Sequence, residues 1–399
     1  MNPDLTLLQP YPFEKLKKLK EAVTPNPELE HISLSIGEPK HPAPDFVKQA
    51  LIDNIDRLEN YPTTKGLPEL SEAIASWLTT RFELAQIDAT SQVIPVNGTR
   101  EAIFAFAQAA IDRTQSNPLL ISPNPFYQIY EGAAYLSGAT PHFLPCLAEN
   151  GFNPDFDAVS DEVWKDCQLL FLCTPGNPTG ATLSQAQYQQ LIELSDRFDF
   201  IVASDECYSE IYVDGRPAPA GLLQACAAMG RHDYRNCVVF HSLSKRSNLP
   251  GLRSGFVAGD ARLLKPFLLY RTYHGCAMSI QTQLASIAAW NDEAHVEENR
   301  RQYTLKFNAV LEILGPVMDV QQSDASFYLW AGTPIPDDDF AQQLFAQQQV
   351  TVLPGSYVSR TVDGINPGAN RVRMALVAEV DECIEAAHRI RTFVESLKN

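Results

Sequence analysis

The stretch CVVFHSLSKRSNLPGLRSGF, from Cys237 to Phe256, joins an apolar run to a group of cationic and hydroxyl side chains. The run CVVFH (237–241) predicts a buried strand. Lys245 follows that strand between serines, and burial there would lower its pKa and free a nucleophilic amine. Arg253 offers a planar fork suited to phosphate. The stretch therefore predicts a site for an aldehyde that carries a phosphate, although a solvated surface lysine remains an alternative at this point.

Composition favours an ordinary globular protein of more than one domain. The residues are 45% hydrophobic and 20% charged. A chain of 399 residues is longer than one compact domain with a single hydrophobic core usually is. A net charge of −17 argues against nucleic acid and anionic membranes as partners. The eight cysteines form no CxxC pair and the eight histidines no HxxxH spacing. We expect neither a disulfide framework nor a metal site.

The N-terminal segment MNPDLTLLQPYPFEKLKKLK has no signal-peptide core, and no apolar run reaches membrane length. These features predict a cytoplasmic protein. Seven prolines from Pro10 to Pro44 predict an extended arm, interrupted by a short basic helix near Glu14–Glu21.

Short apolar runs alternate with amphipathic helical patterns from residue 92 onward. The predicted strands are QVIPVN (92–97), PLLIS (118–122), QLLFLC (168–173), FIVASDE (200–206) and CVVFH (237–241). Predicted helices include DFVKQALIDNI, LPELSEAIASWLTTRF, the segment after Thr99, and SQAQYQQLIELSDRF with a capping box of Ser184 and Gln187.

This alternation predicts an α/β fold with a mostly parallel sheet flanked by helices. We expect that sheet to form a large domain at residues 46–284. A long helical stretch from Ile280 to Gly315 leads into a smaller α+β domain, which we expect to combine residues 1–45 and 285–399.

Several motifs fall at the ends of predicted strands, where ligands of parallel sheets bind. Gly98 and Thr99 lie between a strand and a helix, so their backbone N–H groups could hold a phosphate. Tyr127, in NPFYQIY, could stack on a flat heterocycle. Asn177, in TPGNPTG, is held extended by the following proline and could project into a cleft. Each segment is also compatible with plain structure.

Two further motifs carry charged side chains. Asp205, in SDECYSEIY, ends a buried run, where a cationic ring nitrogen would satisfy its carboxylate; a helix cap is the alternative. Tyr208 could donate to an oxygen on the same ring. In NRVRMALV, Arg371 and Arg373 share one strand face, and Arg373 could clamp a carboxylate or form a surface ion pair.

Taken together and in this order, the motifs resemble the fold-type I pyridoxal-phosphate aminotransferases of class I/II, the group that includes aspartate aminotransferase. The resemblance runs from SIGEPKHP near Ser35 to the VRMAL segment. It implies a homodimer with shared active sites, in which an amino acid and a 2-oxo acid exchange an amino group by ping-pong kinetics, commonly with 2-oxoglutarate and glutamate as one pair.

The resemblance also implies roles for individual residues. Lys245 would be the Schiff-base lysine and proton shuttle, Asp205 would hold the pyridine nitrogen protonated, and Asn177 and Tyr208 would bond the phenolic oxygen. Tyr127 would stack on the ring. The residues implied around the phosphate are Gly98, Thr99, Arg100, Ser242, Ser244, Arg253 and, from the neighbouring subunit, Tyr61. Arg373 would grip the substrate α-carboxylate, with Gly37 beside it.

The segments LQPYPFEKLKKL, SIGEPKHPAP and LPGSYVSRTVDGINPGANRVRMALV are similar to those of bacterial N-succinyldiaminopimelate aminotransferases of lysine biosynthesis. That substrate is long and polyanionic. Arg360, Tyr11 and Phe13 are the candidates for its distal end, and Arg100 could serve either the phosphate or that end. Alternatively, Arg360 belongs to a mobile loop, and Tyr11 and Phe13 belong to an arm that clasps the dimer.

Other functions remain open from the sequence. An aspartate- or alanine-type aminotransferase has the same cofactor residues, and so does a β-eliminating lyase, which would need no oxo-acid acceptor. A regulator built on this fold would carry an added DNA-binding domain, for which the extent of the resemblance leaves no room.

Overall fold

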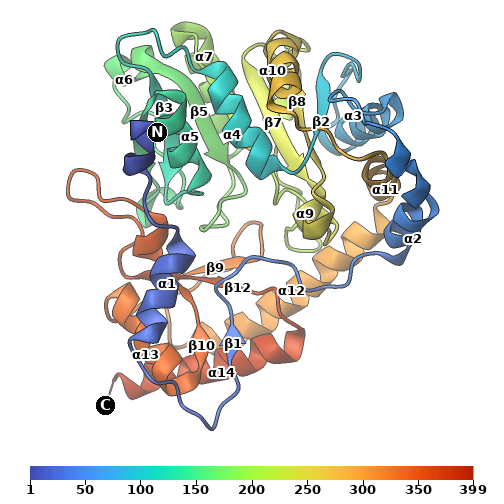
Figure 1. Ribbon diagram of the computed structural model, residues 1–399. Coiled ribbons are helices and arrows are strands. Elements are labelled where there is room, and N and C mark those ends of the chain that lie inside the picture. The colour runs from blue at the N-terminus through green and yellow to red at the C-terminus, as the bar shows by residue number, and fades with distance from the viewer. Residues whose placement is uncertain (399) are drawn as a thin grey trace.

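A seven-stranded sheet lies at the centre of the larger part of the molecule in the computed structural model, which describes residues 1–398 (Figure 1). Its strand order is β2-β8-β7-β6-β5-β3-β4. The strands are β2 (Val93–Val96), β3 (Leu119–Asn124), β4 (Thr140–Pro145), β5 (Cys167–Cys173), β6 (Ile201–Asp205), β7 (Cys237–Ser242) and β8 (Gly255–Gly259). Only β8 runs antiparallel to its neighbours β2 and β7. The predicted α/β class with a mostly parallel sheet is confirmed.

All five predicted strands are present, but β4 and β8 were not predicted. The sequence GFVAG of β8 resembles a loop because glycine is rare in strands. Its glycines are needed where they stand: a Cβ on Gly255 would lie 2.5 Å from the carbonyl oxygen of His241 on the neighbouring strand. Glycine thus permits the close approach of β8 to β7.

Helices cover both faces of this sheet. One face packs against α3 (Pro68–Phe82), α6 (Asp161–Asp166), α7 (Gln185–Phe198), α8 (Leu222–Ala228), α11 (Ile280–Trp290) and α2 (Asp45–Asp53). The other packs against α4 (Thr99–Ala110), α5 (Ile129–Ser137) and α10 (Ala261–His274). Successive residues of β5 alternate between the two cores, as period-two side chains require. The predicted capping box of Ser184 and Gln187 starts α7.

A smaller part contains two short sheets covered by helices (Figure 1). The antiparallel sheet has the order β11 (Leu353–Pro354), β12 (Arg371–Ala375), β9 (Tyr328–Gly332). Strand β1 (Ile32–Ser33) pairs in parallel with β10 (Val350–Thr351). Helices α12 (Ala294–Leu314), α13 (Asp337–Gln348) and α14 (Val380–Ser396) pack with these strands around one apolar core. The domain boundaries 46–284, 1–45 and 285–399 stay a prediction.

The helical stretch predicted from Ile280 to Gly315 is two helices, α11 and α12, so its continuity was wrong. The chain breaks at Asn291–Glu293, where Asp292 Oδ1 accepts a hydrogen bond of 3.0 Å from the backbone N–H of His295. This hydrogen bond lies in the turn between the two helices: α11 packs in the core of the large sheet, while α12 contributes to the core of the smaller part.

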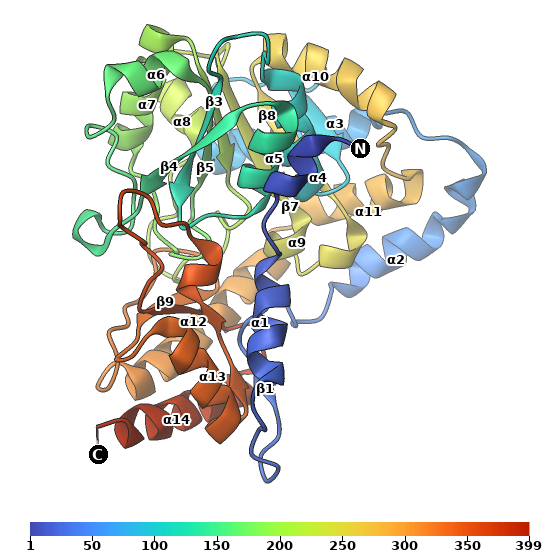
Figure 2. The same ribbon diagram turned by 60° about the vertical axis from the view of Figure 1, so that its left-hand side comes forward.

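The N-terminal arm crosses both parts (Figure 2). Its first turn, η1 (Pro3–Leu7), lies against α5, and α1 (Pro12–Glu21) lies beside α13. The remaining short elements are η2 (Ile55–Glu59), η3 (Ala148–Asn150), α9 (Leu243–Arg246), η4 (Pro250–Leu252) and η5 (Gly355–Val358). Within residues 1–398, no helix is long and apolar enough to cross a bilayer.

Candidate active site

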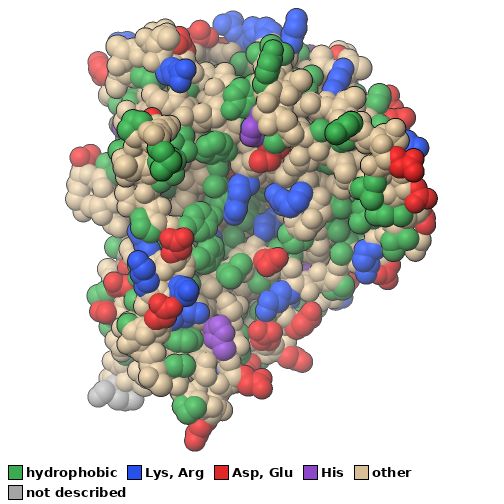
Figure 3. Space-filling model, in the orientation of Figure 1, with side chains coloured by type: hydrophobic (Ala, Val, Ile, Leu, Met, Phe, Trp, Pro, Cys, Tyr) green, Lys and Arg blue, Asp and Glu red, His purple; other side chains and the backbone are tan. Residues whose placement is uncertain are grey.

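A cavity of about 490 Å³ lies at the carboxyl ends of the central strands, between the two parts of the molecule. Figure 3 shows Lys and Arg side chains gathered in the hollow at this level. Most residues predicted for the site line it: Gly37, Thr99, Arg100, Tyr127, Asn177, Asp205, Tyr208, Ser242, Ser244, Lys245, Arg253 and Arg373. Tyr11 and Phe13 of the arm also line it. Gly98 and Tyr61 do not, and the side chain of Tyr61 is fully exposed.

Lys245 projects into this cavity from α9, the short helix after β7. Ser242 caps that helix by accepting a hydrogen bond of 3.1 Å from the N–H of Ser244. The amine of Lys245 donates to the carbonyl oxygen of Gly37 over 2.5 Å. Burial lowers the pKa of Lys245 to about 8, and the charges of Arg373 and Arg100 lower it as well. An appreciable neutral fraction is therefore present near neutral pH, as a nucleophile requires.

Asp205 is a buried acid at the end of β6. Its Oδ2 accepts a hydrogen bond of 3.0 Å from the hydroxyl of Tyr130, and its Oδ1 accepts one of 3.3 Å from the N–H of Cys207. Burial raises the pKa of this carboxyl group. Among the described residues no cation pairs with it, and no helix follows β6 directly, so a helix cap does not account for it. A cationic ring nitrogen in the cavity would stabilise its charged form.

Hydroxyl groups, a guanidinium and a helix N-terminus meet at the other end of the cavity. Gly98 has φ +86° and precedes α4; a Cβ there would lie 2.1 Å from Nη2 of Arg253. Within residues 1–398, Arg253 donates only to the carbonyl oxygens of Pro250 (2.8 Å) and Asn97 (3.4 Å). The hydroxyls of Ser242 and Ser244 are 2.9 Å apart. This donor set fits a phosphate group.

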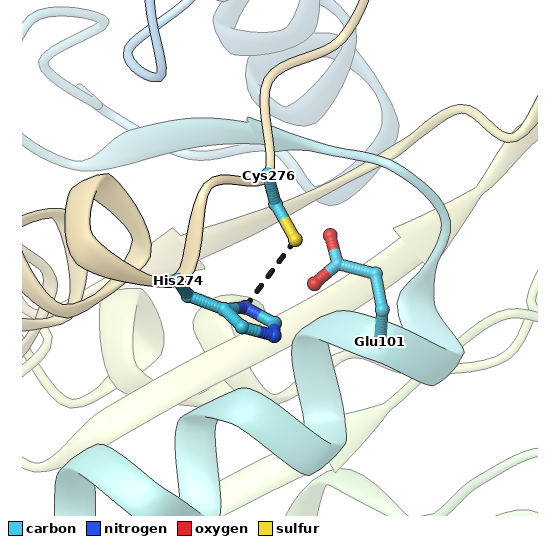
Figure 4. Close-up of side chains that lie close together, drawn as sticks. All are labelled: Glu101, His274 and Cys276. Atoms are coloured by element: carbon cyan, nitrogen blue, oxygen red, sulfur yellow. Dashed lines mark hydrogen bonds between the residues drawn. The ribbon is translucent and has the colours of Figure 1, made fainter.

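Behind this turn, Glu101 braces α4. Glu101 Oε1 accepts from the N–H of Asn97 (3.0 Å), and both of its oxygens accept from Arg271 Nη1 (2.8 Å each). Glu101, His274 and Cys276 also come close enough to ligate a metal, with Cys276 Sγ 3.3 Å from His274 Nδ1 (Figure 4). Because the buried Arg271 already holds the carboxylate, we assign the group a bracing role; the expected absence of a metal stays a prediction.

Arg373 reaches the cavity from β12 and has no carboxylate partner within residues 1–398. It donates to Asn177 Oδ1 (2.8 Å) and to the carbonyl oxygen of Ser35 (2.7 Å), while its buried Nε has no partner. Its guanidinium lies 4.4 Å from the ring centroid of Tyr328, whose hydroxyl is 3.1 Å from that of Tyr208. A buried guanidinium with a free donor is suited to a substrate carboxylate.

The neighbouring Arg371 has a different environment. It pairs with Asp319 (3.2 Å) and does not line the cavity.

The two arginines considered for the distal end of a substrate have different positions. Arg100 lines the cavity, with Nε 2.5 Å from the hydroxyl of Tyr127 and Nη2 3.3 Å from that of Tyr11. Arg360 does not line it, contrary to the expectation for the distal site. The reason is Glu131, a buried carboxylate on α5 that accepts from Arg360 Nε over 2.8 Å.

Among the residues that sequence reasoning missed in or beside the site are Tyr130, Tyr328 and Glu38. Tyr130 holds Asp205, Tyr328 contacts Arg373, and Glu38 is an exposed acid that lines the cavity. Tyr130 belongs to the motif that contains Tyr127, so its spacing was a usable signal. Tyr328 lies in an apolar strand and reads as a core residue, and nothing in its local sequence marks it.

Comparisons with known proteins identify the same family along almost the whole chain. A family model described as aminotransferase class I and II matches residues 30–390. The LL-diaminopimelate aminotransferase of Maridesulfovibrio salexigens is 32% identical over 97% of both chains. An aminotransferase structure from Neisseria meningitidis superposes with a TM-score of 0.95 and 50% identity, covering 98% of this chain and 100% of that one. The aminotransferase AspB from Helicobacter pylori gives 0.89 and 35%, over 97% and 99%.

Proposed function

The chain belongs to the class I and II aminotransferases, whose members use pyridoxal phosphate, and on this premise we propose that it acts on N-succinyl-LL-2,6-diaminopimelate. In the proposed reaction the amino group passes to 2-oxoglutarate, which gives N-succinyl-2-amino-6-oxopimelate and glutamate. The reaction would belong to lysine biosynthesis. Support comes from the diaminopimelate aminotransferases among its relatives and from the charge of the cavity.

We propose that the predicted residues hold the cofactor, since the donor set at one end of the cavity fits a phosphate and Asp205 fits a protonated ring nitrogen. Bound pyridoxal phosphate supplies an aldehyde for amine exchange and a ring that stabilises negative charge on the substrate α-carbon. The phosphate would be held by Gly98, Thr99, Ser242, Ser244 and Arg253, the phenolic oxygen by Asn177 and Tyr208, and the ring by Tyr127.

Lys245 and Arg373 would act on the substrate. The Nζ atom of Lys245 would take the α-proton of the donor in one half-reaction and return a proton to the α-carbon of glutamate in the other. Its pKa of about 8 suits a group that must both accept and release a proton near neutral pH. Arg373 would orient the α-carboxylate beside Gly37, whose carbonyl oxygen contacts the lysine amine.

The observation that carries the substrate assignment is the charge of the cavity lining. Its cationic side chains are Arg100, Lys245, Arg253 and Arg373, while its carboxylates are Glu38 and Asp205. The phosphate would occupy Arg253 and the α-carboxylate would occupy Arg373, which leaves Arg100 as the guanidinium of the lining with no anion assigned to it. A donor with a further carboxylate is therefore favoured over alanine.

Unsubstituted LL-diaminopimelate is the second candidate. The curated relatives carry that name, and Glu38 offers a carboxylate to a distal ammonium group. The test is a panel of N-succinyl-LL-diaminopimelate, LL-diaminopimelate, aspartate and alanine with 2-oxoglutarate, followed by the glutamate formed. Greater kcat/KM for LL-diaminopimelate, lost in Glu38→Gln, would replace our proposal with the second candidate.

An aminotransferase needs an oxo-acid acceptor for sustained turnover and a β-eliminating lyase does not, so omitting the acceptor distinguishes the two activities. We expect no sustained turnover of any donor when 2-oxoglutarate is omitted, because each enzyme molecule can accept an amino group only once. Continuous release of ammonia and pyruvate without acceptor would contradict transamination as the main activity.

We also propose a cytoplasmic homodimer with shared active sites. Tyr61, implied for the partner's phosphate, is fully exposed and outside its own cavity, as a residue that serves another subunit would be. All eight cysteines are free thiols, as expected in a reducing compartment. Light scattering should give twice the chain mass, and Tyr61→Phe should weaken cofactor retention without changing that mass.

A further inference from the structure

We propose that Lys306, His41 and Asn299 form a hydrogen-bond chain that positions Lys245 for proton transfer. They are positioning residues, since none of the three lines the cavity. The inference rests on the proposed role of Lys245 and goes beyond it, because it holds for whichever amino donor the enzyme takes. It gives a purpose to a buried lysine and a histidine that the proposed reaction does not otherwise use.

Three residues of α12 share one buried face. Asn299, Tyr303 and Lys306 stand at positions i, i+4 and i+7, which lie on the same side of a helix, and each is at most 4% exposed. Lys306 is completely buried and forms no ion pair within residues 1–398. Glu382, an acid of α14 near Lys306, pairs with Lys40 instead (3.7 Å). A buried ammonium group without a carboxylate must be stabilised by hydrogen bonds to neutral groups.

His41 accepts a hydrogen bond from that ammonium group. The Lys306 amine lies 2.6 Å from His41 Nε2, and His41 Nδ1 lies 2.8 Å from Asn299 Oδ1. Asn299 Nδ2 donates to the carbonyl oxygens of Lys245 (3.2 Å) and Arg246 (3.3 Å). Because the amide nitrogen serves two carbonyls, its oxygen must accept from His41 Nδ1–H, which leaves Nε2 to accept from the lysine. Burial lowers the pKa of His41, which keeps the ring in the neutral form that this chain requires.

The chain ends at the helix that carries Lys245. Helix α9 has only four residues, and so short a helix neither satisfies its last carbonyl oxygens nor persists on its own. Ser242 caps its first turn, and Asn299 closes the other end by binding the carbonyls of Lys245 and Arg246. Asn299 therefore holds the backbone from which the Lys245 side chain projects.

The same chain holds the segment that contacts the tip of the Lys245 side chain. The carbonyl oxygen of Gly37, four residues before His41, accepts from the Lys245 amine over 2.5 Å. Lys306 also donates to the carbonyl oxygen of Val377 (3.4 Å), two residues after β12. Both ends of the Lys245 side chain are thus tied to β12 through one set of hydrogen bonds. Loss of the chain should displace the Nζ atom from the α-carbon of a donor, and such small displacements slow a reaction strongly.

The experiment compares two histidines that each lie against an aromatic ring. His41 lies 4.8 Å from Tyr303 between ring centroids, and His31 lies 5.7 Å from Phe345. His31 Nε2 is 2.7 Å from the hydroxyl of Thr351, so it also makes a hydrogen bond, but it does not belong to the chain. Replacing either histidine by phenylalanine keeps a ring and removes the hydrogen bonds.

The first measurement is the rate constant of one half-reaction in the holoenzyme. Excess donor, chosen as the one that the substrate panel ranks first, is mixed with enzyme, and the visible absorbance of the bound cofactor is followed. For His41→Phe we expect the rate constant per cofactor-containing site to fall about tenfold, with a change of less than about twofold in the Kd of the donor. His31→Phe should change the rate constant less than about twofold.

Two further variants test the chain itself. His41→Gln keeps one donor and one acceptor and should recover the rate constant to within about threefold of the wild type. Lys306→Met removes the first donor and should lower the rate constant about threefold to tenfold; it provides the test if His41→Phe does not fold.

The second measurement uses the cofactor-free protein. Uptake of pyridoxal phosphate requires attack by the Lys245 amine, so its rate reports on the position of that group without any turnover. At pH 7 we expect uptake by His41→Phe to be about threefold to tenfold slower than by the wild type, and uptake by His31→Phe to be unchanged.

The inference is overturned if both phenylalanine variants lower the denaturant midpoint alike and leave the two rates per site unchanged, because the chain would then serve folding alone. It is also overturned if His41→Phe raises the Kd of the donor in proportion to the lost rate, which would indicate a role in substrate binding. Failure of the proposed function is a separate result: sustained turnover by Lys245→Ala would refute the role of Lys245, and that measurement does not involve the histidine variants.

Discussion

Replacing Lys245 by methionine should stabilise the cofactor-free protein at neutral pH, although it removes the reactive amine. Burial lowers the pKa of Lys245 from 10.5 to about 8, so this amine binds its proton less tightly in the folded protein than in the unfolded chain. Below pH 8 this difference costs the folded state about 3 kcal/mol. Methionine has a similar length and no charge to bury.

The substitution also removes favourable contacts. The amine donates to the carbonyl oxygen of Gly37 and lies 5.2 Å from the ring centroid of Phe327, and together these contacts contribute about 1–2 kcal/mol. We therefore expect Lys245→Met to raise the free energy of unfolding by about 1–2 kcal/mol at pH 7.

The dependence on pH identifies the cause. Between pH 8 and 10.5 the unfolded chain binds more protons at Lys245 than the folded protein does, so the stability of the wild type rises with pH in this window and that of the variant does not. The advantage of methionine should disappear across the window. Guanidinium unfolding of both cofactor-free proteins from pH 7 to 10.5 measures the difference, with Lys17→Met, an exposed lysine, as the control. A stability difference that stays constant over this range would refute the reasoning.

Three further outcomes are expected. Asp205→Asn, which loses the charge facing the cavity, should lower kcat about tenfold to hundredfold with little change in KM, measured by steady-state glutamate formation. Arg373→Lys should raise the KM of every amino donor about tenfold, because an ammonium group cannot form the paired hydrogen bonds; equal KM values would contradict its role. Arg271→Met leaves Glu101 unpaired and should cost about 2–3 kcal/mol in guanidinium unfolding. The control, Arg301→Met on α12, removes an arginine that is 51% exposed and whose partner Glu298 is exposed as well, and should cost less than about 1 kcal/mol.

The sequence predicted the parallel core and most of the cavity lining, because both follow from local patterns. A run of buried residues predicts a strand, and the polar residue that ends it lies at the ligand edge of the sheet, as Asp205 and Ser242 do. The strand β8 was missed because its glycines allow its backbone to lie close to that of β7, a contact that depends on the folded sheet and not on the local sequence.

Contacts between distant segments account for the remaining differences. The carbonyl of Gly37 meets the amine of Lys245, and Glu131 captures Arg360, across more than two hundred residues in each case. No local pattern encodes such pairs. The local sequence around a loop arginine does not show whether its guanidinium binds a ligand or pairs with a buried carboxylate of the protein, because that depends on the tertiary structure.

The pairing of β1 with β10 has a consequence for synthesis of the chain. Ile32 lies opposite Val350, so this strand leaves the ribosome about 300 residues before its partner exists. At about 5–20 residues per second, the arm waits roughly 15–60 seconds with its apolar side chains unpaired, while the seven-stranded sheet, complete by Gly259, can already form. The last part of the enzyme to assemble is therefore the one made from its first residues, and chaperones that act on the nascent chain would meet the arm rather than the sheet.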